Sequence, residues 1–161
     1  MRSPQAAPDE PAPLAGMTPM PTTPFGWIAS HAWLYPALEV VHLVGVALLI
    51  GNLALVELRL WVAPADPTPA VTRAALALVL AGFGLAALSG LTMFASQPAD
   101  LIGNRAFGVK MLLLMLAGCN AAAFHARGGL ARRDGLARAQ TALSLVTWLA
   151  ILACGRWIAY A

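Results

Sequence analysis

Four apolar stretches, each long enough to cross a bilayer, dominate this chain of 161 residues. They are predicted at 35–61, 73–96, 105–126 and 138–160. About 20 apolar residues in a helix span the hydrocarbon core of a membrane. Open strand edges cannot lie in hydrocarbon, and the stretches are much longer than barrel strands, so each is predicted to be a helix. Only 11% of the residues are charged, against about 25% in soluble domains.

Proline and glycine separate the four stretches. Pro64 and Pro67 follow the first, Pro98 closes the second, and Gly128 with Gly129 breaks the chain after the third. Proline interrupts a helix and glycine disfavours it, so the connections are predicted to be short loops. The fold class predicted is an all-α membrane protein, an up-down bundle of four transmembrane helices within a single domain, 34–161.

The first 33 residues are predicted to lie outside that bundle. Residues 1–24 are rich in proline and form a disordered tail without the basic and apolar regions of a signal peptide. The first span would therefore serve as the uncleaved targeting element. Residues 25–33 carry Trp27, Ile28 and Trp33 and are too short to span, so they are predicted to form an amphipathic helix at the membrane surface.

The arginines in the loops predict the orientation. Six of them flank two loops on one side: Arg59, Arg73, Arg127, Arg132, Arg133 and Arg138. The other side has three: Arg2, Arg105 and Arg156. Positive residues favour the cytoplasmic side. We therefore expect a multi-pass protein of a bacterial inner membrane with both termini in the periplasm. The bilayer, rather than a nucleic acid, is the expected partner, with other membrane subunits or further copies of the chain as further partners.

A polar cluster is predicted in the outer leaflet. Counting the rise per residue places Glu39, Lys110 and Arg156 at one level, with His42 about one turn deeper on the same face of its helix as Glu39. Ionisable side chains in a span are costly and usually face a partner or a cavity. In one interpretation Glu39 pairs with a cation and the group only supports folding, as in an accessory subunit. In another, the cluster is an outward-facing pocket for a small anionic ligand, a lipid headgroup or a partner subunit.

His42 also allows a redox interpretation. Met111 and Cys154 lie at its depth and Met93 somewhat nearer the surface. Histidine with soft sulfur ligands would suit copper or haem b. His125 is at the opposite end of its span, about 19 Å away along the membrane normal. That offset argues against a haem held by His42 and His125.

The inner end carries a second set of ionisable residues, predicted to form a solvated anchoring girdle: Glu57, Arg59, His125 and Arg127. The sequence contains no motif of a catalytic triad (a nucleophile, a base and the residue that orients it), no phosphate-binding loop and no zinc signature. Hydrolytic or transfer chemistry is therefore not indicated, and a catalytic role is not the favoured interpretation.

Three segments carry a resemblance to a known family. They are the run from Trp33 through His42 to Gly45, the run from Asn104 through Lys110 to His125, and the run 155–160. Over 33–160 the chain resembles an uncharacterised family, a domain of unknown function, of small four-helix bacterial inner-membrane proteins. The resemblance implies the architecture and adds no activity. More distantly, the chain is similar to copper-resistance D-type proteins and b-type cytochrome membrane modules, which implies copper or haem b as a cofactor.

Overall fold

The computed structural model describes residues 24–62 and 68–160. Nearly all of the predicted tail lies outside these residues. Every element of secondary structure within them is helical. In chain order the elements are α1 (Gly26–Ser30), α2 (Leu34–Val62), α3 (Pro69–Ser96), α4 (Pro98–Ile102), α5 (Arg105–Ala126), α6 (Gly129–Arg132), α7 (Gly135–Trp157) and the 3-10 helix η1 (Ile158–Tyr160).

The helix ends follow the local sequence. Helix α5 begins at the predicted residue because Asn104 caps it, its side-chain oxygen accepting the N–H groups of Ala106 at 2.9 Å and Phe107 at 3.3 Å. Helix α3 starts at Pro69 rather than at residue 73, since proline is well accommodated in the first turn. Helices α4 and α6 occupy connections that were predicted to be loops.

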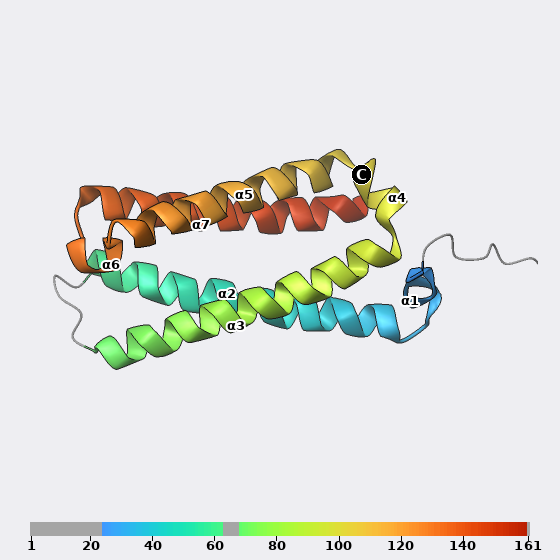
Figure 1. Cartoon of the computed structure of the whole chain (residues 1–161), viewed down its shortest axis with the longest axis horizontal. Coiled ribbons are helices and arrows are strands. Elements are labelled where there is room, and N and C mark those ends of the chain that lie inside the picture. The colour runs from blue at the N-terminus through green and yellow to red at the C-terminus, as the bar shows by residue number, and fades with distance from the viewer. Residues whose placement is uncertain (1–23, 63–67, 161) are drawn as a thin grey trace, which may run out of the picture.

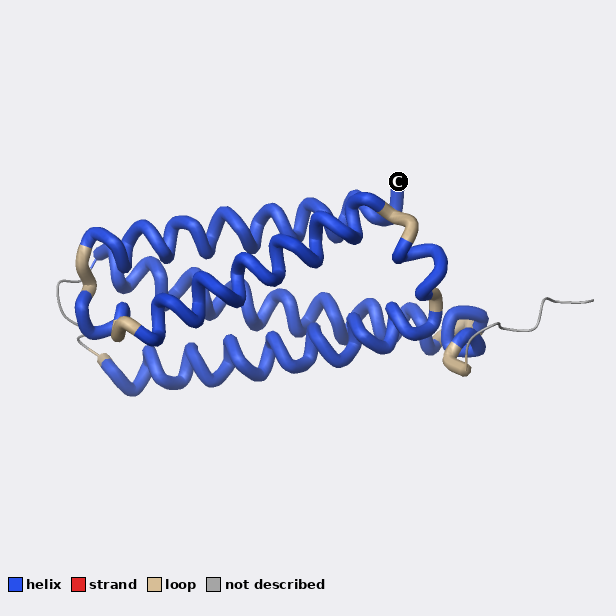
Figure 2. Tube along the Cα trace, turned by 45° about the horizontal axis from the view of Figure 1, so that its top comes forward, coloured by secondary structure: helices blue, strands red, loops and turns tan. Residues whose placement is uncertain are grey.

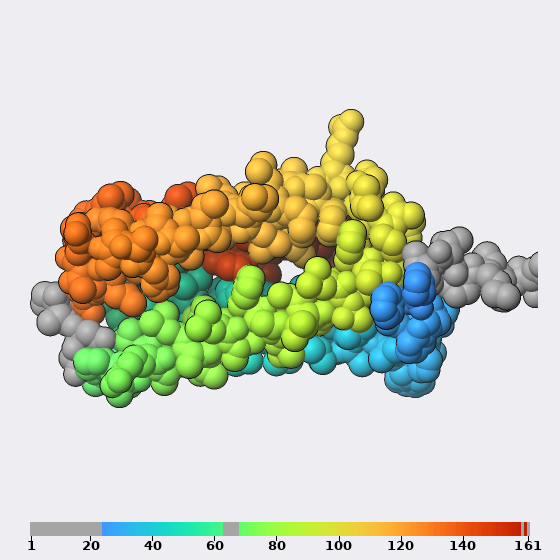
Figure 3. Space-filling model, viewed as in Figure 1, coloured from blue at the N-terminus to red at the C-terminus, as the bar shows by residue number. Residues whose placement is uncertain are grey.

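The long helices are arranged as two antiparallel hairpins (Figures 1 and 2). Helices α2 and α3 form one, α5 and α7 form the other, and the hairpins meet mainly through α2 and α7. Helices α1 and α4 lie at one end and α6 lies at the opposite end. Between α3 and α5 the space-filling view shows an opening through the molecule (Figure 3). Towards α4 these two helices are bridged by Phe94 and Phe107, whose rings stack at 5.4 Å.

The outside of the bundle is apolar and its interior contains hydroxyl groups. Large side chains such as Leu80 and Leu112 are 71% and 69% exposed, whereas Ser89 and Thr147 are buried. This is the reverse of a protein that folds in water, where large apolar side chains are mostly inside. Across 24–62 and 68–160, four helices (α2, α3, α5 and α7) are long and apolar enough to cross a membrane. The prediction of four long apolar helices is confirmed for that part of the chain.

Glycine brings α2 and α3 into backbone contact. A Cβ atom placed on Gly45 would lie 2.6 Å from the backbone nitrogen of Ala86. One placed on Gly82 would lie 2.6 Å from the nitrogen of Leu49 and 2.7 Å from the carbonyl oxygen of Gly45. Close approach at small residues is a common way for membrane helices to pack. This contact holds the first hairpin together at mid-length.

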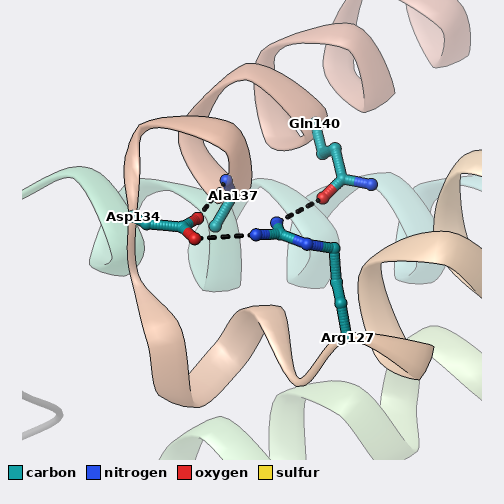
Figure 4. A network of polar contacts seen from close by, with 4 residues as sticks. All are labelled: Arg127, Asp134, Ala137 and Gln140. Atoms are coloured by element: carbon teal, nitrogen blue, oxygen red, sulfur yellow. Dashed lines mark hydrogen bonds and ion pairs between the residues drawn. The ribbon is translucent and has the colours of Figure 1, made fainter.

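A polar network closes the second hairpin next to α6 (Figure 4). The Asp134 carboxylate accepts the Ala137 N–H at 2.8 Å as the N-cap of α7. It also pairs with the Arg127 guanidinium at 2.7 Å. The same guanidinium donates to the side-chain oxygen of Gln140 at 3.0 Å. The network therefore ties the end of α5 to the first turns of α7.

Acidic pH is expected to remove the contribution of Asp134 to stability. The Ala137 N–H, and after it the Arg127 guanidinium, hold the pKa of the Asp134 carboxyl below its ordinary value. A carboxyl whose pKa falls on folding stabilises the fold above its unfolded pKa of about 3.9. That contribution is lost as the pH falls through the lower folded pKa. Wild type should unfold at a higher temperature than Asp134→Ala at neutral pH, and the two should converge in acid, as followed by circular dichroism in detergent.

Asp134→Asn is the matched control for this titration. Asparagine also caps helices well but carries no titratable carboxyl. Its stability relative to Asp134→Ala should therefore be independent of pH. A gap between wild type and Asp134→Ala that stays constant into acid would contradict the role given to the carboxylate.

Candidate functional site between the two hairpins

His42 is held in a defined orientation by α3. Its Nδ1 lies 2.9 Å from the carbonyl oxygen of Ala86 and 3.1 Å from the hydroxyl oxygen of Ser89. A carbonyl oxygen can only accept a hydrogen bond, so Nδ1 carries the hydrogen and Nε2 carries the lone pair of the neutral ring. Gly90 leaves room for the ring, because a Cβ there would lie 3.2 Å from His42 Cε1.

Lys110 approaches the same site from the other hairpin. Its ammonium lies over Gly155 of α7, 3.5 Å from where a Cβ would stand. It is also within electrostatic range of His42 and of Cys154. No carboxylate forms an ion pair with Lys110 among the residues that the structure describes. The predicted cluster is thus assembled in part, with a half-buried cation and a half-buried imidazole within electrostatic range of each other.

Glu39 and Arg156 lie outside this site. Glu39 is exposed, and within 24–62 and 68–160 no ion pair joins it to Lys110 or Arg156. Arg156 is exposed as well, donating to the hydroxyl of Tyr160 and stacking on its ring, with 4.9 Å from Cζ to the ring centroid. The expected neutralisation of the cations by Glu39 is therefore not found in the structure.

The sulfur residues predicted near His42 lie on three different helices. Cys154 of α7 is half-buried and within electrostatic range of Lys110, whereas Met111 of α5 is 38% exposed and Met93 of α3 is half-buried. In the described part of the chain, no group of three or more His, Cys, Asp or Glu side chains could hold a metal ion.

Glu57 departs from the prediction of a solvated girdle. The side chain is only 6% exposed, so the prediction is wrong for this residue. Ser144 of α7 donates a hydrogen bond to its carboxylate, and Oε2 has no partner among the described residues. Hydropathy could not reveal this burial, because α2 is apolar on all sides. In the structure Glu57 lies with Leu53 and Leu60 on the side of α2 that faces the other helices. By contrast His125 is exposed, as predicted.

Comparison with known proteins adds no further assignment. No protein-family model, curated protein or solved structure matches this chain. The function therefore has to be inferred from the two polar sites that the helices build, one around His42 and Lys110 and the other around Glu57.

Proposed function

We propose that this chain is a multi-pass protein of a bacterial inner membrane, with both termini in the periplasm. Four long apolar helices and an apolar exterior support insertion. The loop arginines support the orientation, since the loops that join α2 to α3 and α5 to α7 carry most of them. In this orientation His42 and Lys110 lie in the half of the bundle nearer the periplasm.

The site between the hairpins is proposed to bind an acidic group, a carboxylate or a phosphate. The observation that carries this proposal is the Lys110 ammonium, which points into the bundle without a carboxylate partner among the described residues. A cation in a membrane interior is costly unless an opposite charge or hydrogen bonds compensate it. An anionic ligand would supply that charge.

The acidic group could belong to an anionic lipid headgroup that reaches the site from the bilayer. The opening between α3 and α5 faces the side of the bundle (Figure 3). A small soluble acid entering from the periplasm is the other source of the same chemistry. The test has to separate these two sources.

Lys110→Gln is expected to bind anionic lipid at least tenfold more weakly than wild type. The protein would be reconstituted in nanodiscs of mixed phosphatidylglycerol and phosphatidylcholine, and bound lipid counted by native mass spectrometry. Arg105→Gln is the matched control, since it removes one positive charge from the exposed start of the same helix. Equal retention of phosphatidylglycerol by Lys110→Gln and wild type would contradict a headgroup site. Binding of inorganic phosphate or acetate to lipid-free protein, lost in Lys110→Gln, would instead identify a soluble acid.

The second candidate is a redox module with haem b or copper bound through His42. The hydrogen bond from Nδ1 to the Ala86 carbonyl favours it. Histidines that bind metals commonly donate their other ring N–H to a carbonyl in this way, which fixes the tautomer. The visible absorption spectrum and metal content of the detergent-purified protein decide between the candidates. Absence of both a Soret band and stoichiometric copper would rule out the redox function.

A further inference from the structure

A second pocket lies in the opposite half of the bundle, towards α6. Helices α2, α3, α5, α6 and α7 all contribute to it, and its volume is about 60 Å³. Its apolar lining includes Leu53, Leu76 and Phe124. The Glu57 carboxyl lines the same space. The pocket is far from the site of His42 and Lys110, because Glu57 and His42 are separated by four turns of α2.

The polar groups around Glu57 are already engaged with one another. The Asn120 side chain donates to the Gln140 backbone oxygen at 2.8 Å. The Thr141 hydroxyl accepts from the Trp61 indole at 2.9 Å and donates to the Arg138 carbonyl at 2.9 Å. Only Ser144 bonds to the carboxyl among the described residues. The remaining oxygen, Oε2, therefore has to be satisfied by something that enters the pocket.

We propose that this pocket is a hydrated proton-binding site, with Glu57 as the group that takes up and releases the proton. A volume of about 60 Å³ is large enough to admit water. It is well below the roughly 150 Å³ of an apolar cavity that binds benzene. An unpaired carboxylate so deeply buried is costly, and a bound proton removes its charge.

The charged surroundings favour a proton over a metal cation. The described residues contain no set of three acidic or metal-binding side chains that could coordinate an ion here. The groups that face the pocket from the other elements are His125 of α5 and, through Gln140, the Arg127 guanidinium. Helices α3 and α6 contribute Leu76 and Leu130, which do not titrate. A nearby guanidinium opposes a second cation, whereas a proton on Glu57 leaves a neutral acid.

His125 provides the route to bulk water. It lines the pocket and is exposed at the end of α5. In the transfer, an imidazolium N–H bond breaks and, through pocket water, an O–H bond forms at Glu57 Oε2. The imidazolium becomes neutral imidazole and the carboxylate becomes a neutral carboxylic acid. The reverse step returns the proton to water at this end of the bundle.

Infrared difference spectroscopy during pH jumps tests the proposal. The wild-type protein in lipid vesicles is expected to show the C=O stretching band of a carboxylic acid that appears and disappears reversibly with bulk pH. Glu57→Gln should lack this band, while Glu39→Gln, the same change at an exposed position of the same helix, should retain it. Loss of the band in Glu39→Gln, or no difference between Glu57→Gln and wild type, would overturn the proposal. Circular dichroism would establish that both variants are folded.

Two further measurements test whether the ligand of Glu57 is a proton and whether the proton reaches it through His125. Replacing sodium by potassium or ammonium at constant ionic strength should leave the band unchanged, and its suppression by one of these ions would identify a cation site instead. In D₂O the band should shift within the mixing time in wild type and several-fold more slowly in His125→Ala. Equal exchange rates in the two proteins would contradict the role of His125.

Discussion

Gly82→Ala is expected to destabilise the bundle by about 1–3 kcal/mol, the usual range for overpacking a close contact. The added methyl group would lie 2.6 Å from the Leu49 nitrogen and 2.7 Å from the Gly45 oxygen. Both are backbone atoms of α2 and cannot rotate away. Relief requires the two helices to separate, which weakens the hairpin that also orients His42. The free energy of unfolding, measured in mixed detergent micelles, is the direct readout.

Gly84→Ala is the matched control for this prediction. Gly84 lies two residues further along α3, on roughly the opposite side of the helix, and a Cβ placed there meets nothing within 4 Å. Alanine also has a better helix propensity than glycine, by up to about 1 kcal/mol. The control should therefore be as stable as wild type or more stable. Similar effects of both substitutions would show that the helix contact at Gly82 does not limit stability.

Glu57→Met is expected to stabilise the protein by about 1–3 kcal/mol, because burying a carboxyl costs more than burying an apolar side chain even when water or a proton reaches it. Methionine has a similar length and fills the same space with an apolar, flexible chain. The substitution removes the unsatisfied Oε2. Ser144 loses its acceptor but can donate to a backbone carbonyl of its own helix. Thermal unfolding should shift upwards by about 2–4 °C per kcal/mol for a chain of this length.

Glu39→Met controls for the general effect of replacing a carboxylate in α2. Glu39 is exposed and makes no ion pair with Lys110 or Arg156 in the described residues. Its replacement should change stability by less than about 0.5 kcal/mol, as for ordinary surface substitutions. A lower stability of Glu57→Met than of wild type would mean that the carboxyl, with its bonds to Ser144 and to water, stabilises the fold more than an apolar side chain does. A gain would show that the chain keeps Glu57 at a cost in stability, as functional sites commonly do.

The four long helices could be predicted from the residues because the thickness of a bilayer sets their length. Each predicted span overlaps an observed helix, and 105–126 coincides with α5. The ends were predicted less well where capping decides them. Asp134 starts α7 at Gly135, three residues before the predicted start, because its side chain satisfies an N–H group in the first turn.

The two glutamates of α2 show what hydropathy could not predict. Depth counting placed His42 and Lys110 in one polar cluster, and in the structure the two side chains lie within electrostatic range of each other. The same counting predicted that Glu39 lies in the polar cluster and that Glu57 is solvated. In the structure Glu39 is exposed and Glu57 is buried. In a helix that is apolar on all sides, the pattern of side chains does not reveal which side faces the other helices.

The number of long helices, their approximate ends and their apolar exterior follow from the residues alone, because hydrocarbon accepts only long apolar helices with internally bonded backbones. The rotation of each helix about its axis could not be predicted from the residues, because the packing of the helices against one another determines it. Gly45 and Gly82 allow α2 and α3 to meet at one pair of faces, and this contact directs His42 towards α3. The burial of Glu57 beside Ser144 likewise depends on how α2 and α7 meet.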